Sequence, residues 1–162
     1  MALYICSLDV SPDQLIPADG QYHLIRFPCD RAPYDPWGMH APDHPDGYTI
    51  TDWQTDPRSG LIWPAASGWG TLTAEIQWAS GDYNETRDRF VRDPLGLNGA
   101  PNDTNLEDRY PTGGMQFVHK THSIFVSPDV PLGLEVKHNA SGPVYVTYAQ
   151  FKLAIETDVA AP

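Results

Sequence analysis

Alternation of apolar and polar residues is the feature that most constrains the fold of this chain. It is clearest over residues 71–78, where Leu72, Ala74, Ile76 and Trp78 would share one face. A period of two residues is typical of a strand with one buried and one solvated face. No stretch of ten residues shows a helical period. We therefore expect an all-β chain built from antiparallel strands.

The longest expected strand covers residues 144–156 and would cross a whole sheet. Alternation predicts that one of its faces is formed by Tyr145, Thr147, Ala149, Phe151, Leu153 and Ile155. Shorter strands are expected at residues 3–10, 21–27, 47–53, 59–64, 85–92, 115–121, 123–126 and 132–138. The first two of these short strands are typical of an N-terminal hairpin.

Proline and glycine separate these strands, with 16 Pro and 13 Gly spread over 162 residues. Many short strands between such turn signals predict an antiparallel β-sandwich or jelly roll. The length fits a single domain spanning residues 1–162. Within it, five prolines make residues 28–47 an extended arm or loop. Residues 95–114 are expected to form a second long, polar loop, of the kind that is usually functional.

Charge and hydropathy exclude several function classes. The formal net charge is −11, and the ten Lys and Arg residues form no patch that could bind a phosphate backbone. No apolar run is long enough to span a membrane. The N-terminus lacks the features of a signal peptide, so Cys6 and Cys29 are expected to be reduced thiols rather than a disulfide.

Two segments contain side chains that bind metals in other proteins. His40 and His44 are four residues apart, but Pro42 prevents the helix that would align them. Asp103 and Asn105 lie in an oxygen-rich segment without the order of an EF-hand loop. Both segments are better explained as solvated turns. We expect no metal, no cofactor and no catalytic constellation, and hence no enzyme.

Four of the five tryptophans are candidates for binding surfaces, whereas Trp78 is expected to lie in the core. Trp53, Trp63 and Trp69 lie in or near expected loops, where they could stack on a sugar or fill the end of the sandwich. Tyr34 and Trp37 lie in the Pro-rich arm, and we expect them to contact a neighbouring subunit or partner.

From residue 47 onward, the order of expected strands resembles the trimeric jelly rolls of the TNF/C1q-like class, including versions found on bacteriophage virions. The resemblance is carried by GYTI at 47–50, LTAEIQW at 72–78, PLGLEVKHN at 131–139 and VYVTYAQFKLAIE at 144–156. It implies a homotrimer in which one sheet of each protomer packs near a threefold axis. Tyr145, Tyr148 and Phe151 would then lie in that seam. The class works by binding, so no catalytic residue is implied.

The resemblance and the acidic composition together suit a protein of the virion surface, assembled in the host cytoplasm. The expected function is capsid decoration, in which the protein binds the major capsid protein or other virion proteins and stabilises the particle. The alternative is a carbohydrate- or receptor-binding module of a phage tail or fibre. Neither function involves nucleic acid or a membrane.

Overall fold

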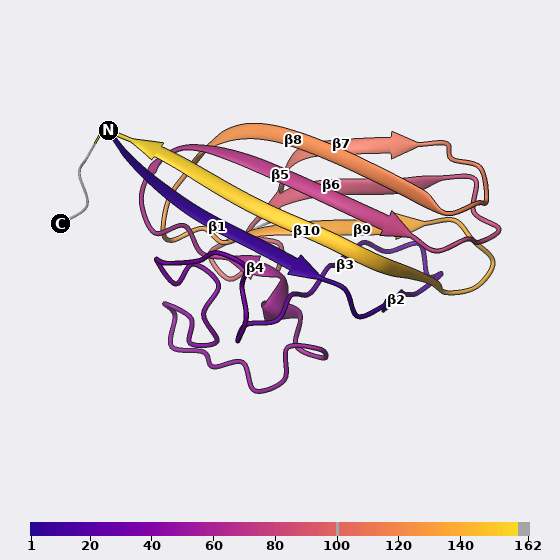
Figure 1. Cartoon of the computed structure of the whole chain (residues 1–162), viewed down its shortest axis with the longest axis horizontal. Coiled ribbons are helices and arrows are strands. Elements are labelled where there is room, and N and C mark those ends of the chain that lie inside the picture. Colours follow the sequence, from indigo (N-terminus) through magenta and orange to yellow (C-terminus); the bar gives the residue numbers. More distant parts are fainter. Residues whose placement is uncertain (100, 159–162) are drawn as a thin grey trace.

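A computed structural model of the protein describes residues 1–99 and 101–158. It consists of two antiparallel sheets stacked face to face, which confirms the expected all-β sandwich (Figure 1). Within the described residues the only helical element is η1, a 3₁₀ turn at Pro57–Gly60. No helix in this part of the chain is long and apolar enough to cross a membrane.

The first sheet contains the longest strands. Its order is β1 (Ala2–Val10), β10 (Val144–Thr157), β5 (Gly68–Trp78) and β8 (Gln116–Val126). The short strand β2 (Gln14–Ile16) pairs with the start of β10. β8 is one continuous strand where the sequence predicted two. It forms the edge of the sheet on the side away from β1.

The second sheet lies beneath the first. Its order is β3 (His23–Leu24), β9 (Leu132–His138), β6 (Thr86–Arg92) and β7 (Asn102–Arg109). The short strand β4 (Leu61–Ile62) also pairs with β9. β1 and β3 lie in different sheets, so the predicted N-terminal hairpin is wrong.

One core fills the space between the sheets. The apolar face predicted for β5 is fully buried, with Leu72, Ala74, Ile76 and Trp78 no more than 1% exposed. Phe151 of β10 stacks on Phe90 of β6 with ring centroids 5.9 Å apart. Burial of these alternating faces supplies the main stabilisation of the sandwich.

One predicted strand is a loop in the structure, and part of one predicted loop is a strand. Residues 47–53 do not form a strand, and their only ladder contact is an isolated bridge between Asp43 and Thr49. Residues 102–109, predicted as part of a loop, form the edge strand β7. Its partner β6 supplies the backbone hydrogen bonds that a polar sequence would otherwise take from water.

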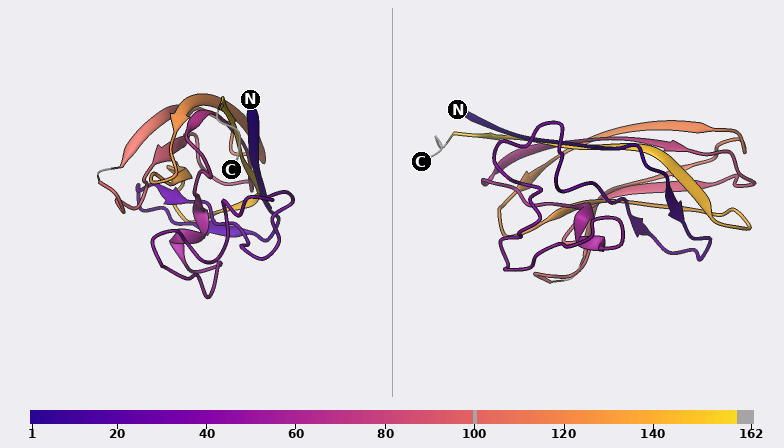
Figure 2. Two further views of the ribbon diagram at one scale, coloured as in Figure 1. Left: turned by 90° about the vertical axis from the view of Figure 1, so that its left-hand side faces the viewer. Right: turned by 60° about the horizontal axis from the view of Figure 1, so that its bottom comes forward.

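The segment between β3 and β4 folds against one side of the sandwich, as both views of Figure 2 show. Met39 and His40 in this segment are 1% and 2% exposed. The backbone N–H of Trp63 donates to the carbonyl of Met39 at 2.7 Å. The Pro-rich segment at residues 28–47 is thus held on the body of the domain by buried contacts.

Candidate functional site

The outer face of the first sheet carries two groups of exposed apolar side chains. At one end, pairing across the strands aligns Leu3, Trp69 and Phe125 in one row with Glu156. Trp69 and Phe125 are 55% and 58% exposed. Such a group on an acidic protein is typical of an interaction site, whereas single exposed apolar residues are ordinary.

The second group lies at the opposite end of the same face. Phe117 of β8 is 58% exposed, and its row continues through Gln77 of β5 to Tyr148 of β10. Met115 and Tyr145 are also exposed near this end. We call the face that includes both groups the outer face.

A polar band separates the two groups. In one of its rows, Gln150, Glu75 and His119 are paired across β10, β5 and β8. In the next, Thr73 lies between Lys152 and Thr121. If two copies of the chain were to contact each other through this face, the polar rows would have to find polar partners, because buried polar groups need hydrogen bonds. This requirement would favour one relative position of the two copies.

Phe151 does not belong to any such surface. It is fully buried, so its predicted place in a subunit seam is wrong. The cause is a β-bulge between Val146 and Tyr148 in the pairing of β10 with β5. A bulge shifts the alternation by one residue. Tyr145 and Tyr148 therefore point to the outer face, while Phe151 remains in the core.

Tyr34 and Trp37 keep accessible surface on the segment beside β1. Tyr34 is 51% exposed and is anchored through its backbone, which exchanges hydrogen bonds with Ser7 at 2.7 and 3.4 Å. Trp37 is 40% exposed and its ring lies 5.2 Å from that of Tyr4. Both side chains remain available to a partner.

The three tryptophans predicted to contact sugar are in different environments. Trp63 is 6% exposed, so it does not offer a stacking surface and this prediction is wrong. Trp53 is partly buried against the core. Trp69 alone is broadly exposed, and it lies on the outer face.

The structure does not bring the candidate metal ligands together into a site. Both ring nitrogens of His40 lie near backbone carbonyls, Nδ1 2.8 Å from Leu61 and Nε2 3.2 Å from Phe27. His44 is buried beside the ring of Trp63, 5.5 Å away. Burial lowers the pKa of both histidines, so both favour the neutral form.

Asn105 lies on β7, far along the chain from either histidine, and the side chain of Asp103 falls outside the described structure. Among the residues described, no group of three His, Cys, Asp or Glu side chains could hold a metal ion.

Both cysteines are free thiols, as predicted. Burial, together with the charges of Asp30 and Asp56, raises the pKa of Cys29 to about 11. The Sγ atom of Cys29 lies 3.7 Å from Nε2 of His40. Because the nucleophile is the thiolate, a thiol with so high a pKa is not an activated one.

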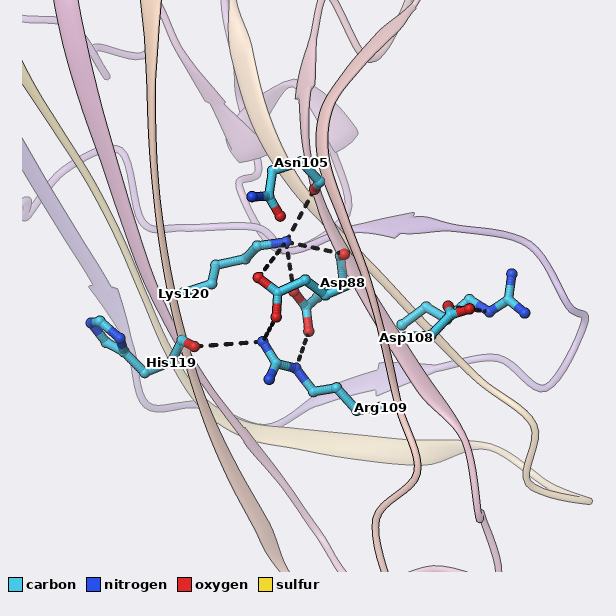
Figure 3. A network of polar contacts seen from close by, with 8 residues as sticks. Asp88, Asn105, Asp108, Arg109, His119 and Lys120 are labelled. Atoms are coloured by element: carbon cyan, nitrogen blue, oxygen red, sulfur yellow. Dashed lines mark hydrogen bonds and ion pairs between the residues drawn. The ribbon is translucent and has the colours of Figure 1, made fainter.

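The sequence did not predict a buried cluster of charges between β6, β7 and β8 (Figure 3). Nζ of Lys120 lies 2.7 Å from Oδ1 of Asp88, and the two side chains are 1% and 3% exposed. Arg109 donates from Nε to Oδ2 of Asp88 at 2.8 Å and from Nη2 to Glu107 at 2.5 Å. The sequence signal was weak: Lys120 shares its face of β8 with Val118, Ile124 and Val126.

Comparisons with known structures agree with this fold. The chain is similar to the structure of Eiger TNF from S. frugiperda, with 12% identity, a TM-score of 0.59 and coverage of 98% of this chain and 97% of that chain. It is also similar to murine APRIL, with 7% identity, a TM-score of 0.54 and coverage of 94% and 99%. The fold is therefore a TNF-like jelly roll. No family model matches the sequence, and no curated protein matches it.

Proposed function

We propose that this protein is a non-catalytic binding protein that works as a homotrimer. The observation that carries the proposal is the pair of exposed apolar groups at the two ends of the outer face. Leaving Trp69, Phe117 and Phe125 in water is unfavourable, and a second copy of the chain would cover them. Surfaces of this kind are usually buried in closed, symmetric assemblies of identical subunits.

The edge position of β8 supports this assembly. Phe117 and Phe125 lie on this edge strand, so a neighbour can approach them from the side as well as from above. Around a threefold axis, the edge of each protomer would lie against the outer face of the next. Large aromatic side chains dominate the binding energy of such interfaces.

The first prediction concerns assembly in solution. Phe117→Glu combined with Phe125→Glu would place two carboxylates in the seam, and burying unpaired charges is strongly unfavourable. We expect the natural protein to have the mass of three protomers and the double variant that of one, measured by light scattering. Tyr34→Glu is the matched control, because Tyr34 is similarly exposed but lies outside the outer face. A natural protein that stays monomeric at every concentration would contradict the proposal.

We further propose that the trimer decorates the outer surface of a virus capsid. The acidic charge gives the free protein solubility and argues against a nucleic-acid partner. Tyr34 and Trp37 remain exposed away from the proposed seam, and they supply aromatic contacts for a second partner. A sugar-binding role would rest on Trp69 alone, because Trp63 is buried and Trp53 is partly buried against the core.

The second prediction tests this role. Purified protein mixed with capsids assembled without it should bind saturably and raise their temperature of disruption, because a ligand of the assembled state stabilises it by mass action. Tyr34→Ala should weaken binding about tenfold, a loss of about 1.4 kcal/mol, and leave the trimer intact. Absence of saturable binding by the trimeric protein would refute capsid decoration without affecting the proposed trimer.

A further inference from the structure

An amine, a carboxylate and a carboxamide converge in the buried cluster of Figure 3. Lys120 reaches from β8 toward the second sheet and contacts Asp88 of β6 at 2.7 Å. Asn105 of β7 pairs directly with Phe90 of β6, and Phe90 is fully buried. Paired residues share a face of their sheet, so Asn105 points into the same interior.

The side chain of Asn105 is incompletely satisfied. Its Oδ1 atom is buried and accepts no hydrogen bond within the described structure. Nζ of Lys120 lies 3.1 Å from the backbone carbonyl oxygen of the same residue. Figure 3 shows the Asn105 side-chain oxygen turned toward the Lys120 amine. A buried polar group without a partner is costly, and its retention points to another role.

We propose that Lys120 and Asn105 form an intramolecular isopeptide bond, with Asp88 as the group that moves the protons. The Lys120 ammonium gives a proton to the Asp88 carboxylate, and the free amine attacks Cγ of Asn105. A Cγ–Nζ bond forms, and the Cγ–Nδ2 bond breaks. The departing nitrogen takes up the protons released by the amine and leaves as ammonium. Asp88 returns to its carboxylate form, and no oxidant or further reactant is consumed.

The surroundings of the three residues favour this reaction. The aromatic ring of Phe90 lies 5.0 Å from Nζ of Lys120, and the Lys120 and Asp88 side chains are almost completely removed from water. Water is therefore largely excluded from the amine and the carboxylate, which contact each other directly. Well-oriented intramolecular reactions reach effective molarities of about 10⁵ M or more.

Arg109 supplies a positive charge that compensates the charge of Asp88 after the reaction. Forming the amide removes the positive charge of Lys120, one of the two cations that contact Asp88. The contact of 2.8 Å from Arg109 to Oδ2 of Asp88 persists and compensates the carboxylate charge. Asp88 contacts Lys120 and Arg109 through its two carboxylate oxygens, and a carboxylate is a poor electrophile. The carboxamide of Asn105 is therefore the group attacked.

The test is the intact mass of the folded, purified protein after it has been denatured. We expect a mass lower than that of the sequence by one ammonia, and a digest in which the peptides containing Lys120 and Asn105 are joined. The full sequence mass after prolonged incubation would overturn the proposal. Loss of one water instead would mean that Lys120 had reacted with a carboxylate, Asp88 or Glu107, and would equally overturn it.

Two variants separate the cross-link from other losses of ammonia. Lys120→Met removes the nucleophile and should restore the full mass expected for that variant. A cyclic imide at an asparagine also loses ammonia, but it would survive Lys120→Met and give no joined peptides. Asp88→Asn keeps the shape of the side chain without a proton acceptor, and we expect it to leave the bond unformed. The measurement on the natural protein stands whether or not the variants fold.

Discussion

Replacing Phe151 with alanine is expected to lower the free energy of unfolding by about 3–5 kcal/mol. The ring is fully buried and lies 5.9 Å from Phe90 and 6.3 Å from Phe27, so its loss would leave a cavity between the two sheets. Denaturant unfolding measures the change. The assay should use the Phe117→Glu and Phe125→Glu background, in which association does not contribute to stability.

Tyr145→Ala is the matched control for this prediction, because Tyr145 lies on the same strand but is 46% exposed. In the monomeric background we expect it to cost less than about 1 kcal/mol. Equal losses for the two variants would contradict the placement of Phe151 in the core and of Tyr145 on the outer face. That outcome would mean that β10 alternates without a bulge, as the sequence suggested, so that Tyr145 and Phe151 share one face.

The parts of the fold that the sequence predicted are those with one apolar and one polar face. β5 is the clearest, because Leu72 to Trp78 alternate without interruption and the buried face is the apolar one. β10 was predicted with nearly the correct extent, but Tyr145 and Phe151 were placed on one face, whereas the structure separates them. No residue type marks the bulge after Val146, since it arises from pairing with β5.

β7 could not be predicted in the same way. Its inward residues Asn105, Glu107 and Arg109 are polar because they contact Lys120 or Asp88 rather than the apolar core. A strand with two polar faces carries no period of two in hydrophobicity and reads as a loop. The buried charge cluster and the missed strand therefore have one cause.

The outer face also could not be predicted from the sequence. On β8, Phe117 and Phe125 alternate with polar residues on their own face, and Lys120 and His122 lie on the other. Neither face is clearly apolar, so the sequence did not indicate which one faces the core. Pairing with β5 settles the question, because it places Phe125 beside the exposed Trp69.

Removing Asp88 is the second large effect that we expect. Asp88→Ala leaves the buried Lys120 ammonium without its nearest carboxylate, with Glu107 4.0 Å away, which should lower the free energy of unfolding by about 3–5 kcal/mol. In the double variant with Lys120→Met no buried amine remains, and most of that loss should be recovered. Denaturant unfolding of the four proteins of this cycle, made in an Asn105→Ala background that cannot cross-link, isolates the ion pair. Additive losses would contradict a coupled pair and would mean that Arg109 alone compensates Asp88.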